Sequence, residues 1–323
     1  MPDRLHTFSR SHEFRLGVIV LAIALCFAAV SPGFRSLGNL RDLLESQAVL
    51  AIMAAGLLVV LIAGGIDISF AAIAAVTQYL VVLSIGRWGG NWALAVLLAG
   101  ALGAAFGAIN ALLIHGLKAP PVIVTIATMT FYFSMLMWST KGVSLYDLPD
   151  WFTTKLTVLT MPFPVFVAAA VLVATAFLLR RLSLGRQIFG LGANPEAARR
   201  MGCNIAGLQC FVYGFSGATA ALAGIMQAHR VEEVAPNALI GRELDVLAAV
   251  VLGGASLTGG VGTVSGTVLG IVLLAMLRNG FTLLGVSSYW FGAVTGLVIL
   301  LSVSATAIVQ RRSDRKGGPH GVS

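Results

Sequence analysis

The chain has 323 residues, of which 58% are hydrophobic and only 11% are charged. Soluble domains contain roughly 25% charged and 45–50% apolar residues, and a soluble core could not hide this much apolar surface. The composition therefore excludes a soluble globular protein and predicts an all-α membrane protein that crosses the bilayer several times.

Ten apolar segments follow one another along the chain, after a polar and basic tail. Most of them reach the roughly 17–25 residues that a helix needs to cross the hydrocarbon layer. The eighth segment is shorter, and we expect a broken or re-entrant element there. The sequence thus predicts ten spans, with eight or nine as alternatives. They lie approximately at residues 16–31, 47–63, 68–86, 92–116, 120–139, 157–179, 206–228, 244–258, 260–278 and 289–309.

A carboxylate interrupts the apolar pattern in the segment AGGIDISF at 63–70. A charged group within a membrane protein is costly unless it is hydrated or paired, and such groups often line transport pathways. Gly64 and Gly65 allow the helix to break at this point. Three interpretations of Asp67 stay open: a cap for a helix that begins at Ile68, a pathway or gate residue, and a proton-coupling carboxylate.

Polar side chains also occur inside the predicted spans. Asn110, Thr125 and Thr128 carry the amide and hydroxyl groups that a sugar pathway needs. Each of them alone is more typical of a hydrogen bond between two helices. Together with Asp67 and Ser69, they are the candidate pathway and gate residues.

The basic loop at 180–205 contains a short helix with its own start and stop signals. Asn194 is a favoured N-cap, Pro195 is a favoured first helical residue, and Glu196 is an acid in the first turn. Gly202 can adopt the left-handed conformation that ends a helix. About two turns of helix are not stable alone, so we expect this loop to dock on a soluble protein; an ordinary basic loop is the alternative. The candidate docking residues are Gly192, Asn194, Pro195, Glu196, Ala197, Ala198, Arg199, Arg200 and Gly202.

The segment at 252–270 is unusually rich in glycine. Small residues four positions apart, such as Gly262 and Gly266, let two helices approach closely. The other glycines are expected to form the turn between the eighth and ninth spans. The pattern GG-x-S-L-T here resembles GG-x-D-I-S at 64–69, which indicates a faint internal repeat. The candidate packing residues are Gly253, Gly254, Gly259, Gly260, Gly262 and Gly266.

The net charge of +8 is concentrated on one side of the predicted membrane topology. If the chain has ten spans and a cytoplasmic N-terminus, the cytoplasmic segments hold 13 of the 21 Lys and Arg residues and 5 of the 13 acidic residues. Their net charge is +8, and that of the remaining loops is zero, as the positive-inside rule requires. Membrane orientation, and not nucleic-acid binding, therefore explains the basic balance. The cytoplasmic segments are 1–15, 64–67, 115–119, 180–205, 259 and 311–323.

The chain lacks the signatures of common catalytic and metal sites. None of its four lysines follows a glycine, so there is no GxxxxGK[ST] phosphate loop. There is no HExxH motif, and the five histidines are scattered. We assign no catalytic residue and no metal ligand, and we do not expect an enzyme.

Five segments together resemble the permease subunit of ribose-type ABC importers, which take up pentoses, other simple sugars and autoinducer-2. The patterns G-x-N-x-x-A-A at 192–198 and GG-x-S-L-x-GG at 253–260 are the most specific parts. The chain departs from GGIDLSVGS, a form frequent in relatives, by having Phe70 and Ala71 after the serine. The five segments are GGIDIS at 64–69, GAINALLI at 107–114, PPVIVTIAT at 120–128, LGRQIFGLGANPEAARRMGCNI at 184–205 and LGGASLTGGVGTVSGTVLG at 252–270.

This resemblance implies the ABC importer permease fold, with about ten transmembrane helices and both termini in the cytoplasm. A cytoplasmic tail would comprise residues 1–15, the transmembrane domain 16–310 and a second cytoplasmic tail 311–323. The loop 180–205 would carry the coupling helix, Asn194–Gly202, which converts closure of an ATPase into movement of the membrane helices.

The resemblance also implies the partners and the location. A cytoplasmic ATP-binding subunit would hold ATP and Mg²⁺, so no cofactor is expected in this chain. A periplasmic sugar-binding protein would deliver the substrate, and a second copy or a homologous permease would complete the dimer. The protein would be a multi-pass protein of the bacterial inner membrane, in contact with lipid and not with nucleic acid.

Three alternatives to this function are open. A relative with the same architecture could import branched-chain amino acids. A secondary transporter could couple a proton or sodium ion to transport through Asp67. A scaffold without transport activity would leave the small-residue spans and the capped loop without a purpose.

Overall fold

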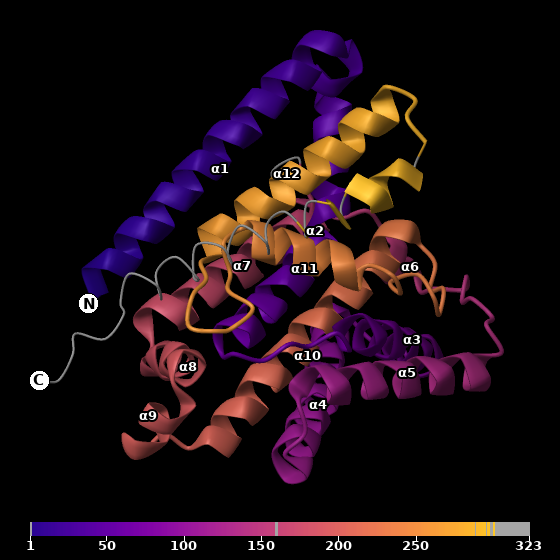
Figure 1. The fold of residues 1–323 in the computed structure, drawn as a ribbon. Coiled ribbons are helices and arrows are strands. Elements are labelled where there is room, and N and C mark those ends of the chain that lie inside the picture. Colours follow the sequence, from indigo (N-terminus) through magenta and orange to yellow (C-terminus); the bar gives the residue numbers. More distant parts are fainter. Residues whose placement is uncertain (1, 159–160, 288, 295, 298–299, 301–323) are drawn as a thin grey trace, which may run out of the picture.

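The computed structural model describes residues 2–158, 161–287, 289–294, 296–297 and 300. Figure 1 shows long helices arranged around α2, and the predicted all-α fold is confirmed. One pair of two-residue strands, antiparallel to each other, lies between α6 and α7. The elements are α1 (Pro2–Val30), η1 (Pro32–Arg35), α2 (Leu37–Ile62), α3 (Phe70–Trp88), α4 (Trp92–Leu117), α5 (Pro121–Thr140), α6 (Asp150–Thr153), β1 (Thr157–Val158), β2 (Met161–Pro162), α7 (Phe163–Arg181), α8 (Ser183–Ala193), α9 (Pro195–Arg200), α10 (Ile205–Val231), α11 (Glu243–Leu252) and α12 (Val264–Leu283).

Within the described residues, eight helices are long and apolar enough to cross a membrane. They are α1 to α5, α7, α10 and α12, and each of them overlaps one of the predicted spans. The chain is therefore a polytopic membrane protein, as its composition predicts.

Two of the ten predicted spans are not among these helices. The segment 244–258 forms α11, whose ten residues extend only about 15 Å and cannot cross the hydrocarbon layer alone. A glycine-rich loop follows it, as expected for a broken or re-entrant element. The last predicted span, 289–309, lies for the most part outside the described residues.

Two helices begin much earlier than the apolar pattern predicts. α2 begins at Leu37 and not near residue 47, because the Oγ of Ser36 accepts a hydrogen bond from the backbone N–H of Asn39, 3.1 Å away, and caps the helix. α1 begins at Pro2, so residues 2–15 of the predicted tail are helical. In both cases, a regular helix extends beyond the apolar residues, and hydropathy alone does not define its end.

The loop 180–205 contains a second helix, α8, which is not among the predicted elements. α8 precedes the predicted short helix, and its Ile188 and Leu191 are buried whereas Arg186 and Gln187 carry its polar side. Apolar residues at 184, 188 and 191 follow the three-to-four-residue spacing of an amphipathic helix. This spacing was the signal available in the sequence.

The loops at the ends of the helices gather on two faces, as alternating spans require. On one face, the Nε2 of His12 lies 3.0 Å from the backbone oxygen of Leu252, and α9 projects beside the N-terminus and the α11–α12 loop (Figure 1). We call it the α9 face. On the opposite face, Leu145 pairs with Val234 through two backbone hydrogen bonds, and Lys155 forms a salt bridge with Glu232.

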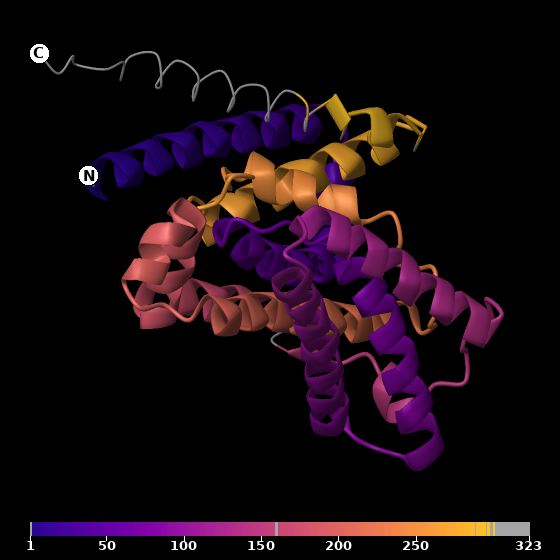
Figure 2. The same cartoon turned by 60° about the horizontal axis from the view of Figure 1, so that its bottom comes forward.

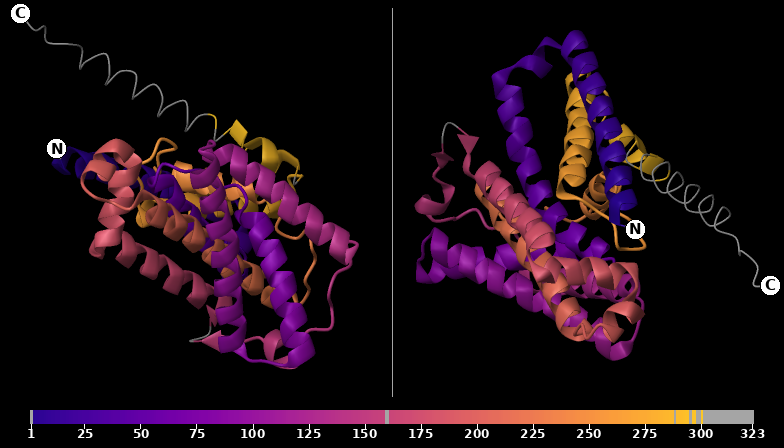
Figure 3. Two further views of the ribbon diagram at one scale, coloured as in Figure 1. Left: turned by 90° about the horizontal axis from the view of Figure 1, so that it is seen from below. Right: turned by 90° about the vertical axis from the view of Figure 1, so that its left-hand side faces the viewer.

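The helices divide into two neighbouring groups, one that contains α1 and α12 and one that contains α3, α4 and α10. α1 runs alongside α12 on the outside of the bundle in both Figure 2 and the right-hand view of Figure 3. α10 packs against α2, α3 and α4 in the other group. α2 touches both groups, and every residue from Ala48 to Ile62 is buried. A helix that is apolar on all sides is expected at such a central position.

Small residues allow α4 and α10 to approach until their backbones touch. A Cβ atom added to Gly103 would lie 2.2 Å from the carbonyl oxygen of Gly217, and one added to Gly107 would lie 2.0 Å from that of Tyr213. Membrane helices lack a hydrophobic driving force between them, so their association depends on such close packing.

We expect Gly107→Val to prevent the association of α4 with α10. The valine would overlap the Tyr213 carbonyl, and overpacking of this kind destabilises a protein by about 1–3 kcal/mol or more. The matched control is Gly100→Val on the same helix, because nothing lies within 4 Å of a Cβ at that position. The yield of monodisperse protein and the midpoint temperature of thermal unfolding in detergent should both decrease for Gly107→Val and not for Gly100→Val. Equal values for the two variants would contradict this packing.

Candidate functional site

The short loop between α2 and α3 holds a buried carboxylate. The side chain of Asp67 is 1% exposed. Its Oδ1 accepts hydrogen bonds from the hydroxyl of Ser69 at 2.6 Å and from the backbone N–H of Ser69 at 2.9 Å. Its Oδ2 accepts one from the hydroxyl of Ser216 on α10, at 2.9 Å. No cation forms a salt bridge with Asp67 in the described part of the chain, so neutral donors alone satisfy it.

Two further helices join this polar cluster. The amide of Asn110, on α4, donates to the Oγ of Ser69 at 2.7 Å. The hydroxyl of Thr125, on α5, lies 3.3 Å from the carbonyl oxygen of Ile66. Thr128 is buried one turn further along α5, and its hydroxyl donates to the carbonyl oxygen of Thr125. The structure thus brings Asp67, Ser69, Asn110 and Thr125 together from three parts of the chain and leaves Thr128 at the edge.

The cluster differs in two ways from the sequence-based view. α3 begins at Phe70, with Ser69 as its N-cap residue, so Asp67 does not cap a helix that begins at Ile68. Instead it holds the turn before the helix through the N–H of Ser69, two residues on. Ser216, a polar residue inside a predicted span that is not among the candidate pathway and gate residues, completes the cluster through a hydrogen bond between helices. Nothing in the sequence relates a serine 149 positions away to Asp67, since the pairing depends on how α10 packs.

The predicted start of α9 is confirmed. The Oδ1 of Asn194 accepts a hydrogen bond from the backbone N–H of Ala197 at 3.0 Å, and Pro195 is the first helical residue. The predicted stop is confirmed too. Gly202 has φ +83°, and the N–H groups of Cys203 and Gly202 donate to the carbonyl oxygens of Ala198 and Arg199. These two bonds form a Schellman motif.

α9 presents its charged residues to solvent. Arg199 and Glu196 are both exposed and lie 3.9 Å apart, a separation at which a surface pair contributes little to stability. Arg200 is exposed as well, whereas Ala198 is 1% exposed and faces the protein. The right-hand view of Figure 3 looks onto the face that carries α8 and α9. α9 is thus a short helix with capped ends and charged side chains exposed on its outer side.

One glycine connects α8 and α9 to the core of the bundle. A Cβ atom added to Gly192 would lie 1.8 Å from the carbonyl oxygen of Ile62, at the end of α2, and 2.6 Å from the backbone nitrogen of Gly260. The N–H of Gly260 donates to that same Ile62 oxygen at 2.9 Å. Asp67 lies only five residues beyond Ile62. The segment 62–65 at the end of α2, residues 192–193 at the end of α8 and the loop residues 259–260 therefore meet at one point, which we call the glycine junction.

The remaining candidate glycines form tight turns or close packing contacts, and Gly259 and Gly262 do so at the junction. Gly254, Gly259 and Gly260 have positive φ angles, as a tight turn requires. A Cβ at Gly262 would approach Leu58 and Ile62 of α2 to about 3 Å. Gly253 and Gly266 pack directly against each other, because a Cβ at Gly266 would lie 2.0 Å from the Gly253 oxygen.

We expect Gly192→Ala to open the glycine junction. The added methyl group overlaps the Ile62 carbonyl, so α8 and the end of α2 must move apart, at a cost of about 1–3 kcal/mol. Gly190→Ala, on the same helix, is the control: its Cβ meets nothing within 4 Å, and alanine favours a helix by about 0.5–1 kcal/mol. The midpoint temperature of thermal unfolding in detergent should be lower for Gly192→Ala than for the unmodified protein, and unchanged or higher for Gly190→Ala. An unchanged Gly192→Ala protein would contradict the contact.

Comparison of the sequence with known proteins shows the family to which the chain belongs. Residues 39–303 match the family described as the permease component of branched-chain amino acid transport systems. The chain belongs to this permease family. It is therefore a membrane-embedded subunit of a transport system, and its sequence motifs predict this membership.

Individual permeases are similar over nearly the whole chain. The ribose import permease protein of Escherichia coli (strain K12) is 37% identical over 293 residues, which cover 88% of this chain and 91% of that protein. The ribose import permease protein of Bacillus subtilis (strain 168) is 35% identical, with 89% and 90% covered. The autoinducer 2 import system permease protein of Yersinia enterocolitica is 30% identical, with 91% and 84% covered. No solved structure matches the permease.

Proposed function

We propose that this permease is the membrane subunit of an ATP-driven importer that moves a monosaccharide, such as a pentose, deoxysugar or related polyol, across the bacterial inner membrane. The observation that carries this proposal is the similarity, over nearly the whole chain, to proteins named as ribose import permeases in two bacteria. Although the family description refers to branched-chain amino acids, the relatives compared above are named for ribose and autoinducer-2, which favours a sugar.

We propose that α9 binds the cytoplasmic ATPase subunit. This helix has capped ends and exposed arginines, and the chain has no phosphate loop of its own. ATP and Mg²⁺ then belong to that partner. A periplasmic binding protein would dock on the opposite face, which includes residues 229–243. A second permease copy, or a homologous permease, would complete the translocation path between two subunits.

The geometry offers a physical route by which α9 can act on the membrane helices. The glycine junction joins the segment before α9 to the end of α2 by backbone contact, without flexible side chains between them. The Asp67 cluster begins a few residues beyond that point and ties the start of α3 to α4 and α10. Movement of α9 would therefore strain hydrogen bonds between three helices. We propose that this cluster is part of the gate that opens during alternating access.

Uptake by reconstituted complexes tests the proposal. The permease would be placed in liposomes with its ATPase and binding protein, and uptake of radiolabelled ribose and leucine would be measured with and without internal ATP. We expect ATP-dependent accumulation of a monosaccharide and none of leucine. Leucine uptake would support the amino-acid alternative, and ribose uptake that needs no ATPase would support an ion-coupled transporter.

A further inference from the structure

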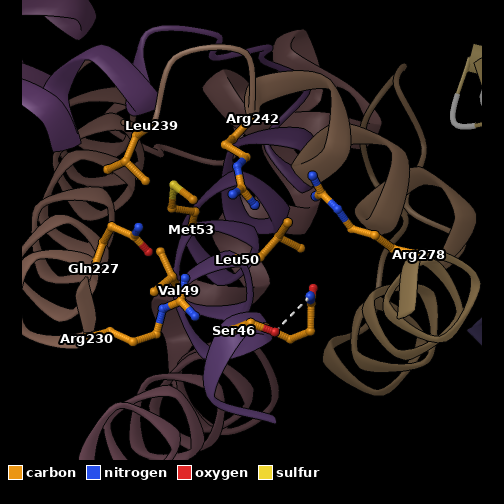
Figure 4. A pocket seen from close by; sticks show the side chains of 10 residues that line it. Ser46, Val49, Leu50, Met53, Gln227, Arg230, Leu239, Arg242 and Arg278 are labelled. Atoms are coloured by element: carbon orange, nitrogen blue, oxygen red, sulfur yellow. Dashed lines mark hydrogen bonds between the residues drawn. The ribbon is translucent and has the colours of Figure 1, made fainter. Parts of the chain in front are cut away.

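A cavity of about 190 Å³ lies beside α2, away from the Asp67 cluster. Figure 4 shows three arginine side chains around it, contributed by α10, by the segment before α11 and by α12. Val49, Leu50, Met53 and Leu239 form an apolar wall, and Ser46, Gln47 and Gln227 add hydroxyl and amide groups. The three arginines are Arg230, Arg242 and Arg278.

Of these three arginines, only one forms a salt bridge with an acidic side chain in the described part of the chain. Arg278 forms a salt bridge with Asp245 at 3.4 Å. In the described part of the chain, neither Arg230 nor Arg242 forms a salt bridge, and the Nε of Arg230 is buried without a hydrogen-bond partner. Burial, and then the positive charge of Arg278, lower the pKa of Arg242, although Asp245 acts in the opposite direction. Positive charge thus accumulates at the cavity, where it would attract an anion.

The residue types around the cavity indicate the class of anion. A guanidinium group binds a carboxylate or a phosphate through paired hydrogen bonds, and it does so more effectively away from water. The neighbouring amide and hydroxyl groups can bind hydroxyl groups. Sites for drug-sized ligands measure about 300–1,000 Å³, so this smaller cavity suits a small solute or a single headgroup.

We propose that this cavity is a binding site for the carboxylate or phosphate group of a small hydroxylated anion, held chiefly by Arg230 and Arg242. Two sources carry this chemistry: a free solute, such as a sugar acid, and the headgroup of an anionic phospholipid. The site does not depend on the ATPase, on α9 or on the identity of the imported sugar.

Binding to the full-length permease in phosphatidylcholine nanodiscs tests the site, with sodium gluconate and inorganic phosphate as probes. Isothermal titration calorimetry at constant ionic strength should show saturable binding of at least one probe. Arg230→Gln and Arg242→Gln should each weaken it at least tenfold. The matched control is Arg87→Gln, since Arg87 is exposed at the end of α3, and it should bind as the unmodified protein does. Should a glutamine variant misfold, Arg242→Lys keeps the charge, removes the paired donors and should still weaken binding.

Nanodiscs that contain phosphatidylglycerol distinguish the two sources. Phosphatidylglycerol that competes with gluconate in the unmodified protein, but not in Arg242→Gln, identifies the headgroup as the occupant; binding unaffected by the lipid identifies a free solute. Absence of saturable binding in either lipid, or equal affinity in all the variants, would overturn the proposal. Neither ATPase nor binding protein is present, so failure here leaves the import experiment unaffected.

Discussion

Reversing the charges of Arg199 and Arg200 to glutamate is expected to abolish ATP-driven uptake and leave the permease folded. Both side chains are exposed, and the described contact of Arg199 is a weak pair with Glu196. Their loss therefore removes little from the free energy of folding. Like charges facing a partner cost several kcal/mol, and each 1.4 kcal/mol lowers affinity about tenfold, so ATPase binding should fall by at least about a hundredfold.

The control for this variant carries the same change of charge on a neighbouring helix end. Arg180→Glu with Arg181→Glu alters two exposed arginines at the end of α7, outside α9. Co-purification with the ATPase, followed by binding-protein-stimulated ATP hydrolysis in liposomes, would be compared for both double variants. Equal loss in both would mean that the general basic charge of this face, and not α9, binds the ATPase. Normal uptake by the Arg199→Glu, Arg200→Glu permease would refute the coupling role of α9.

Replacing Asp67 by leucine is expected to cause the largest loss of stability among the single substitutions considered. The hydroxyls of Ser69 and Ser216 and the N–H of Ser69 would all lose their acceptor inside the protein. Each unsatisfied buried donor costs about 1–3 kcal/mol, so for these three donors we expect a loss of at least about 3 kcal/mol overall. The thermal unfolding midpoint in detergent should fall clearly below that of Asp42→Leu, which alters an exposed carboxylate on α2.

The milder variant Asp67→Asn separates the gate from the proton-coupling interpretation. Asparagine has nearly the same size and retains one acceptor oxygen, so the cluster can partly re-form. If the cluster is part of the gate, uptake decreases but continues to depend on ATP. If Asp67 couples proton movement to transport, the variant loses its response to an imposed pH gradient. Stability of Asp67→Leu equal to that of the control would show that the cluster does not hold the three helices together.

Local signals in the sequence were enough to predict the start and end of α9. The cap of Asn194, the position of Pro195 and the left-handed Gly202 each depend on residues within a few positions, and all three are present in the structure. Hydropathy likewise located the helices long enough to span, because crossing the bilayer sets a minimum apolar length. It did not predict where α2 begins, since a cap and not hydropathy decides that end.

By itself, then, the amino-acid sequence determined the all-α membrane class, the position of most spans and the capped helix, since these depend on composition and on neighbours along the chain. Only the tertiary structure decided that Ser216 meets Asp67, that Gly192 touches the end of α2, and that Arg230, Arg242 and Arg278 surround one cavity. Each of these contacts joins residues far apart in the chain. Their meeting depends on which helices pack together, and close packing of small residues such as Gly107 decides that.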